Sequence, residues 1–134
     1  MDLYKGTIGK RDRRAFLPRP LPEETLRRIL QAGRMTPSSK NSEPNRFVVV
    51  TSPEGRAALA ALSPMARWLG DAAAVIVLVQ TQEHPFDAGR CAQNMMLAAW
   101  EEGISSCPAS MHDEAAAAQV LALPAGHYVA NVIA

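Results

Sequence analysis

The chain has 134 residues, of which 48% are hydrophobic and 20% charged, the proportions of one ordinary globular domain. Its 14 Lys and Arg against 13 Asp and Glu give a formal net charge of +1, which excludes a protein whose overall field attracts nucleic acid. The longest strongly apolar run, residues 72–79, is too short to cross a bilayer, which needs about 20 residues.

Basic residues concentrate near the start of the chain, where six of the 14 Lys and Arg lie in the first 19 positions. The stretch Lys10–Phe16 places four of them around Asp12. Guanidinium groups bind phosphate oxygens in a forked geometry and Lys binds them as a point charge, so this stretch is a candidate phosphate site. A solvated turn before a helix explains the same residues equally well. Asp12 repels a phosphate unless Arg11 or Arg13 neutralises it.

A polar loop follows the first predicted helix, which begins at Pro22 and ends at Gly33. The small polar side chains of this loop, Pro37–Pro44, are Ser38, Ser39 and Asn41. Such side chains hydrogen-bond the polar edge of a heterocycle or a ribityl chain, but Ser, Asn and Pro also favour an ordinary turn between helix and strand. Taken alone, the loop does not decide between a ligand site and a turn.

The rest of the chain alternates between helix and strand patterns. Helices are expected at residues 53–62, 86–102 and 112–121, and strands at 46–51, 73–80, 104–107 and 127–134. The strand expected at 73–80 is apolar up to Val79, as in a strand covered on both faces, and Gly103 is the expected C-terminal cap of the longest helix. The alternation predicts one α/β domain in which helices layer a sheet. Its last strand is apolar, so we expect either that a partner covers it or that the natural product is longer.

Cysteine and histidine usage points away from disulfides and metals. Cys91 and Cys107 are too few for a disulfide framework and lack metal-ligand spacing, so we expect two free thiols in a reducing cytoplasm. The first six residues contain no apolar core of a secretory signal. The three histidines, His84, His112 and His127, have no Cys or acid partners at metal spacing. A buried structural Cys107 is favoured over a Cys107–His112 nucleophile–base pair.

The order of motifs resembles the FMN-dependent nitroreductase superfamily. Lys10–Phe16 has the pattern basic-basic-x-x-Arg-x-aromatic, and Pro37–Pro44 has the pattern Pro-Ser-x-x-Asn-x-x-Pro before a Val-rich strand. Residues 86–107 are similar to the long central helix and following strand of that family, and Leu121–Pro124 is similar to its Leu-Gly-Leu-Pro turn. The resemblance extends from about Lys10 to Ala134.

The resemblance implies a three-layer α-β-α (α+β) fold with a central mixed sheet that dimerises through its central helices. Each of two sites at the dimer interface would then hold one FMN. Residues 1–134 would form a single nitroreductase-like FMN-binding domain that lacks the usual C-terminal segment.

The same resemblance implies the positions of the cofactor-binding residues. Those that match the phosphate- and ribityl-binding block are Lys10, Arg11, Asp12 and Arg14. Those that match the loop beside the flavin ring are Ser38, Ser39 and Asn41. Those that match a loop whose backbone amides approach flavin N5 are Cys107, Pro108 and Ala109. Three positions depart from the family pattern: Asp12 replaces a commoner Ser, and Glu43 and Asn45 replace Gln and Trp. An acid at the first of these positions also occurs in the flavin-cleaving dimethylbenzimidazole synthases.

The activity implied is that of a homodimeric, cytoplasmic oxidoreductase. NAD(P)H would reduce FMN by hydride transfer to N5, and a nitroaromatic, quinone or similar electron-poor acceptor would take the electrons. No side chain is assigned as catalytic acid or base. The alternatives are reductive dehalogenation or flavin cleavage on the same fold, a non-catalytic flavin-binding module, and nucleic-acid binding through the basic stretch. The 5% aromatic content argues against the last.

Overall fold

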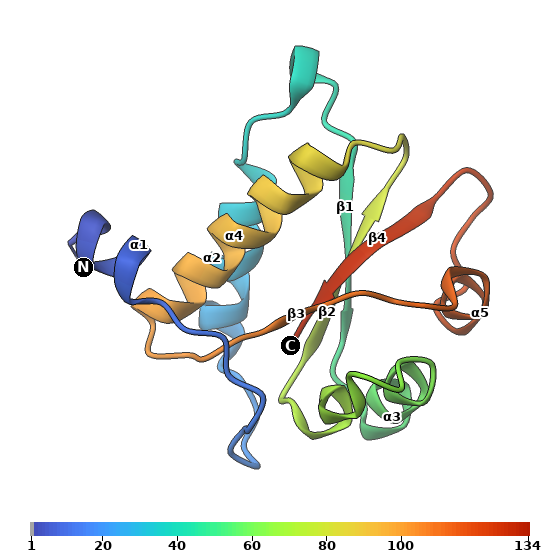
Figure 1. Cartoon of the computed structure of the whole chain (residues 1–134), viewed down its shortest axis with the longest axis horizontal. Coiled ribbons are helices and arrows are strands. Elements are labelled where there is room, and N and C mark those ends of the chain that lie inside the picture. The colour runs from blue at the N-terminus through green and yellow to red at the C-terminus, as the bar shows by residue number, and fades with distance from the viewer. Residues whose placement is uncertain (1) are drawn as a thin grey trace.

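The computed structural model describes residues 2–134, which place helices on both faces of one sheet (Figure 1). The helices are α1 (Leu3–Gly9), α2 (Glu23–Arg34), α3 (Pro53–Ala61), α4 (Pro85–Glu101) and α5 (Glu114–Val120). Two short 3-10 helices are η1 (Ser39–Asn41) and η2 (Arg67–Asp71). The strands are β1 (Asn45–Val50), β2 (Val75–Gln80), β3 (Pro108–Ala109) and β4 (Tyr128–Ile133).

The four strands pair antiparallel in the order β1-β2-β4-β3. Strand β2 lies inside the sheet and every one of its residues is buried, which confirms the strand expected to be covered on both faces. Within residues 2–134, the parallel contact is an isolated bridge between Asp12 and Ser106. The expected mixed sheet is therefore mixed only at this bridge.

Successive residues of β2 point into two separate hydrophobic cores. Val75, Val77 and Val79 pack with residues of α3, η2 and α5. Ile76 and Leu78 lie between them in sequence and pack with residues of α2 and α4. Because side chains alternate between the faces of a strand, these two cores lie on opposite sides of the sheet. The three-layer α-β-α architecture is confirmed.

Two glycines illustrate what the sequence pattern can and cannot predict. Gly103 follows α4 with φ +74°, as expected of a C-terminal capping residue. Gly33 was expected to end α2, and this was wrong, because α2 continues to Arg34 and Gly33 is buried within it. A Cβ there would lie 2.7 Å from Met95 Sδ and 2.9 Å from Phe47 Cζ. Gly33 therefore allows α2 to pack closely on α4.

Two segments differ from the elements predicted for them. Helix α1 was not predicted, although Asp2 caps it by accepting hydrogen bonds from the amides of Tyr4 and Lys5. The strand expected at residues 104–107 lies instead at Pro108–Ala109, next to β4. The second difference matters because this segment carries three of the candidate cofactor-binding residues.

Candidate functional site

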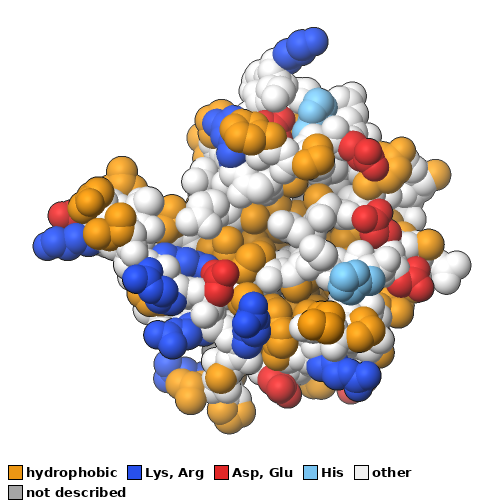
Figure 2. All heavy atoms as spheres, viewed as in Figure 1, with side chains coloured by type: hydrophobic (Ala, Val, Ile, Leu, Met, Phe, Trp, Pro, Cys, Tyr) orange, Lys and Arg blue, Asp and Glu red, His pale blue; other side chains and the backbone are white. Residues whose placement is uncertain are grey.

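The basic cluster, defined as Lys10–Arg14, lies where the chain leaves α1 and runs beside the segment that precedes β3. The backbone of Asp12 bridges to Ser106, and the Arg13 amide donates to the Ser106 carbonyl at 3.1 Å. Figure 2 shows Lys and Arg side chains gathered on this face with an acidic side chain among them. The bridge brings Lys10, Asp12 and Arg14 of the basic cluster close to Cys107.

Lys10, and not Arg11 or Arg13, neutralises the carboxylate of Asp12. The Lys10 ammonium forms an ion pair with Asp12, and the Lys10 side chain is only 5% exposed. The Arg11 guanidinium turns back to α1, where it donates to the carbonyls of Ile8 at 2.8 Å and Lys10 at 2.9 Å. Arg11 therefore satisfies carbonyls at the end of α1 rather than facing the other cations.

Arg14 is an exposed cation held against an aromatic surface. Its guanidinium carbon lies 6.0 Å from the centroid of the Trp68 ring, a cation–π geometry. Phe16 packs on the same indole with 6.2 Å between ring centroids. Among the described residues, Arg14 has no ion-pair partner. The Arg14 charge is thus not neutralised by a carboxylate of the described chain and can attract an anionic ligand.

The segment Cys107–Ala109 is engaged with β4 through its backbone. The Cys107 amide donates to the Ala134 carbonyl at 2.7 Å, and Pro108 has no amide hydrogen. Hydrogen-bonded pairs alternate along an antiparallel ladder, so Ala109, paired with Val132, directs its amide into the sheet as well. Both amides are therefore engaged in the sheet, and the approach of this segment to flavin N5 stays a prediction. The Cys107 thiol is buried, and burial, assisted by Asp12, raises its pKa.

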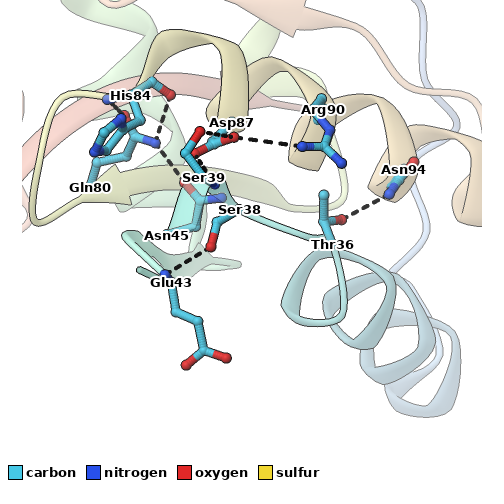
Figure 3. A network of polar contacts seen from close by, with 10 residues as sticks. All are labelled: Thr36, Ser38, Ser39, Glu43, Asn45, Gln80, His84, Asp87, Arg90 and Asn94. Carbon is cyan, nitrogen blue, oxygen red and sulfur yellow. Dashed lines mark hydrogen bonds and ion pairs between the residues drawn. The ribbon is translucent and has the colours of Figure 1, made fainter. Parts of the chain in front are cut away.

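The serine loop, defined as Thr36–Asn45, lies above the N-terminal end of α4 (Figure 1). Three of its non-glycine residues have positive φ, namely Lys40 at 53°, Asn41 at 51° and Glu43 at 50°. Such backbone conformations are unfavourable and persist only where other contacts fix them. One such contact is the hydrogen bond from the Glu43 amide to Ser38 Oγ at 2.9 Å. Figure 3 shows this contact and those that attach the loop to α4.

Asp87 anchors the serine loop to α4, a role that was not predicted from the sequence. Its carboxylate is completely buried and accepts hydrogen bonds from the Ser39 amide at 2.9 Å and the Ser39 hydroxyl at 3.4 Å (Figure 3). The backbone hydrogen bond from Ser39 lowers the pKa of Asp87, although burial opposes the shift. Arg90 lies 3.7 Å away on the next turn. An acid in the first turn of a helix that begins with proline was the available sequence signal.

Of the departures from the family pattern in the serine loop, Asn45 has a local structural role. The Asn45 side chain accepts a hydrogen bond from the buried Gln80 at 2.7 Å, and Gln80 also contacts the backbone of His84. Asn45 therefore holds the start of β1 to the end of β2. The Glu43 carboxylate points away from α4 in Figure 3.

The basic cluster and the serine loop lie at different ends of α4 in one chain. The serine loop contacts α4 at Asp87, whereas Lys10 Nζ lies 3.4 Å from Met96 Sδ. Nine residues of helix separate these two positions, which is about 13 Å along the axis. Pockets of about 890 and 480 Å³ lie around residues 14–22, and no serine-loop residue lines either. The structure brings Lys10, Asp12, Arg14 and Cys107 together, but not with Ser38, Ser39 or Asn41.

Neither a metal site nor a membrane-spanning helix is present within residues 2–134. No group of three or more His, Cys, Asp or Glu side chains there has the arrangement of a metal site. None of the helices in that range is long and apolar enough to span a membrane.

Comparisons with known proteins identify a family and individual relatives. The model of the nitroreductase family matches residues 8–82 and 65–134. A protein of Caulobacter sp. (strain K31) named "Putative NADH dehydrogenase/NAD(P)H nitroreductase" is 43% identical over 53 residues, which are 40% of this chain and 27% of that relative. The matched stretch is thus about a quarter of that relative's length.

Solved structures show the same fold. An FMN-dependent nitroreductase from Clostridium difficile R20291 superposes with a TM-score of 0.92 at 23% identity, over 98% of this chain and 85% of that one. A nitroreductase family protein from Clostridium novyi NT also has a TM-score of 0.92, at 20% identity, over 99% of this chain and 83% of that one.

Proposed function

The chain belongs to the nitroreductase family, and from that membership we propose that it is an FMN-dependent oxidoreductase. In this proposal it works as a cytoplasmic homodimer that uses NAD(P)H to reduce nitroaromatics, quinones or similar electron-poor acceptors. The names of the Caulobacter and Clostridium relatives support the flavin and the electron donor.

The observation that carries the proposal is the cationic corner formed by Lys10 and Arg14 beside Cys107. Two cations from one segment meet a second segment, far away in sequence, and Arg14 remains exposed for an anion. The Ser106 hydroxyl in the same corner is buried and has no hydrogen-bond partner among the described residues. Buried hydroxyls are nearly always hydrogen-bonded, so an unpaired one suits a polar ligand. This donor set fits the phosphate and ribityl chain of FMN.

The separation of the serine loop from this corner supports a site shared by two copies. In a two-fold dimer that packs α4 against α4 in antiparallel orientation, the middle of the helix, near Gln93, lies on the symmetry axis. Asp87 of one copy then lies beside residue 99 of the other, close to the level of Met96 and Lys10. The serine loop of each copy would thus complete the cationic corner of its partner. The exposed α4 residues Phe86, Gly89 and Gln93 leave this face of the helix open for such packing.

Bound FMN would supply the redox chemistry, accepting hydride from NAD(P)H at N5 and passing electrons to the acceptor. Lys10 and Arg14 would hold the phosphate and stabilise negative charge on the reduced cofactor. Ser38, Ser39 and Asn41 would hydrogen-bond the polar edge of the ring from the partner copy. Asp87 would keep that loop in its strained conformation. No side chain needs to act as acid or base in this proposal.

The proposal is tested with the purified chain and FMN under anaerobic conditions. We expect a flavin absorbance spectrum that NADPH or NADH bleaches within seconds and that a quinone or nitroaromatic restores. Bound FMN that NAD(P)H reduces only over many minutes would instead identify a non-catalytic flavin-binding module. Turnover of halophenols, or loss of the flavin itself, would identify the alternative chemistries of the same fold. A chain that binds no flavin at any concentration would refute the proposal.

A further inference from the structure

The ammonium group of Lys10 is already fully occupied within the chain. It forms an ion pair with Asp12, lies 3.4 Å from Met96 Sδ and lies 3.5 Å from the Ser106 carbonyl. A lysine ammonium has three hydrogens to donate, and these three acceptors account for them. A ligand phosphate can therefore reach Lys10 only by displacing one of these acceptors.

Asp12 is the acceptor that an incoming anion would meet first. The Lys10 side chain is 5% exposed and that of Asp12 is 51% exposed, so the carboxylate lies on the solvent side of the pair. A buried ammonium needs a counterion, and Asp12 is the one that the described structure provides. A phosphate would serve the same purpose, but the two anions repel each other at one cation.

Arg11 and Arg14 do not remove this conflict. Arg11 is directed to the carbonyls at the end of α1. Arg14 lies beside Trp68 and Cys107 and has no carboxylate partner in the described chain, so it can attract an anion, but the Lys10–Asp12 pair contributes no net charge. The attraction for a dianion is thus smaller than the number of basic residues implies.

We propose that Asp12 is a specificity-determining residue that competes with the FMN phosphate for Lys10. This inference rests on the proposed function. Its consequence is that the site prefers FMN over riboflavin, which lacks the phosphate, by only a small factor. A neutral residue at position 12 would leave Lys10 to the phosphate without a competing carboxylate and would increase that preference.

The test compares FMN and riboflavin binding, by quenching of flavin fluorescence, to the full chain and to Asp12→Asn. The amide keeps the size of the carboxylate and removes its charge. We expect the variant to bind FMN at least about tenfold more tightly and riboflavin unchanged, because only FMN carries the charge that Asp12 repels. A matched control is Asp113→Asn, which removes one charge from the N-terminus of α5 and retains its capping oxygen. It should change neither affinity.

A second readout uses stability without flavin. Asp12→Asn should lower the melting temperature, because it leaves the buried Lys10 ammonium without a counterion, and inorganic phosphate should restore stability in the variant more than in the unmodified chain. The double variant Lys10→Met/Asp12→Asn removes both charges and should fold if the single variant does not. It should bind FMN no more tightly than the unmodified chain.

The outcomes separate this inference from the proposed function. If the unmodified chain and Asp12→Asn prefer FMN over riboflavin by the same factor, the role of Asp12 is overturned. The role is also overturned if Asp12→Asn loses affinity for FMN and riboflavin equally, because Asp12 would then be a ribityl ligand. If neither flavin binds any variant, the proposed function fails. The competition at Lys10 is then decided by inorganic phosphate: a stabilisation confined to Asp12→Asn supports it, and equal stabilisation overturns it.

Discussion

Replacing Gly33 with alanine tests the close packing of α2 on α4, which sets where the serine loop begins. The new Cβ would lie 2.7 Å from Met95 Sδ, 2.9 Å from Met95 Cγ and 2.9 Å from Phe47 Cζ. Overpacking of this kind costs about 1–3 kcal/mol, and alanine recovers about 1 kcal/mol of helix propensity. Because both Met95 and Phe47 must move, we place the clash at the upper end and expect a net loss of about 2 kcal/mol.

The assay is urea unfolding followed by circular dichroism, with the melting temperature as a second measure. For 134 residues, a loss of this size lowers the melting temperature by about 6–10 °C. Gly9→Ala is the matched control, because a Cβ there meets nothing within 4 Å, and it should not destabilise the chain. Combining Gly33→Ala with Met95→Ala should cost less than the sum of the two single losses, since Met95→Ala removes two of the clashing atoms.

A Gly33→Ala variant as stable as the unmodified chain, with an unchanged urea dependence, would refute the reasoning. It would mean that α2 and α4 lie further apart, and the position of the serine loop relative to Asp87 would then lose its support.

The remaining predictions concern single side chains. The lowered pKa of Asp87 means that its ionisation stabilises the fold above the ordinary carboxyl pKa of 3.8 and that this contribution is lost as the pH falls further. Urea midpoints of Asp87→Asn should therefore depend less on pH between 5 and 3 than those of the unmodified chain, and equal slopes would contradict this. Burial raises the pKa of the Cys91 thiol to about 11, and Cys107 is also buried, so a disulfide reagent at pH 8 should label neither thiol until denaturant is added. Rapid native labelling would show that these cores open. Asp113→Ala should cost about 1 kcal/mol through the lost cap of α5, whereas Asp113→Asn should cost almost nothing.

The elements that the sequence predicts well are those whose pattern is local. Strand β2 is apolar from Val75 to Val79, and α4 combines a long apolar stripe with a capping glycine at Gly103. In such segments burial and backbone preference favour the same structure, so the pattern is sufficient. Helix α1 also had a local signal in Asp2, but too few apolar positions for its pattern to stand out.

The arrangement of the site depends on contacts between distant segments, which no spacing rule reveals. From the sequence, Asp12 was expected to oppose phosphate binding, but the residue that neutralises it could not be identified. Lys10 and Arg11 are adjacent cations, and the end of α1 directs the Lys10 side chain to Asp12 and the Arg11 side chain to backbone carbonyls. Nothing in the sequence likewise connected Ser39 with Asp87, 48 residues away. The sequence thus predicted which kinds of side chain form the candidate site, but not which of these side chains contact one another.

The central claim is that one FMN site takes its cationic corner from one copy and its serine loop from another. The direct measurement is complementation between two variants that each damage one half, Arg14→Glu and Ser39→Phe, followed by FMN titration of each variant and of a mixture refolded together. Each variant alone should bind FMN at least about tenfold more weakly. With random pairing, half of the dimers contain one copy of each variant, and one of the two sites in such a dimer is intact. The mixture should therefore bind FMN tightly at about one quarter of all its sites. A mixture with no tight sites would contradict the shared site and place both halves within a single chain.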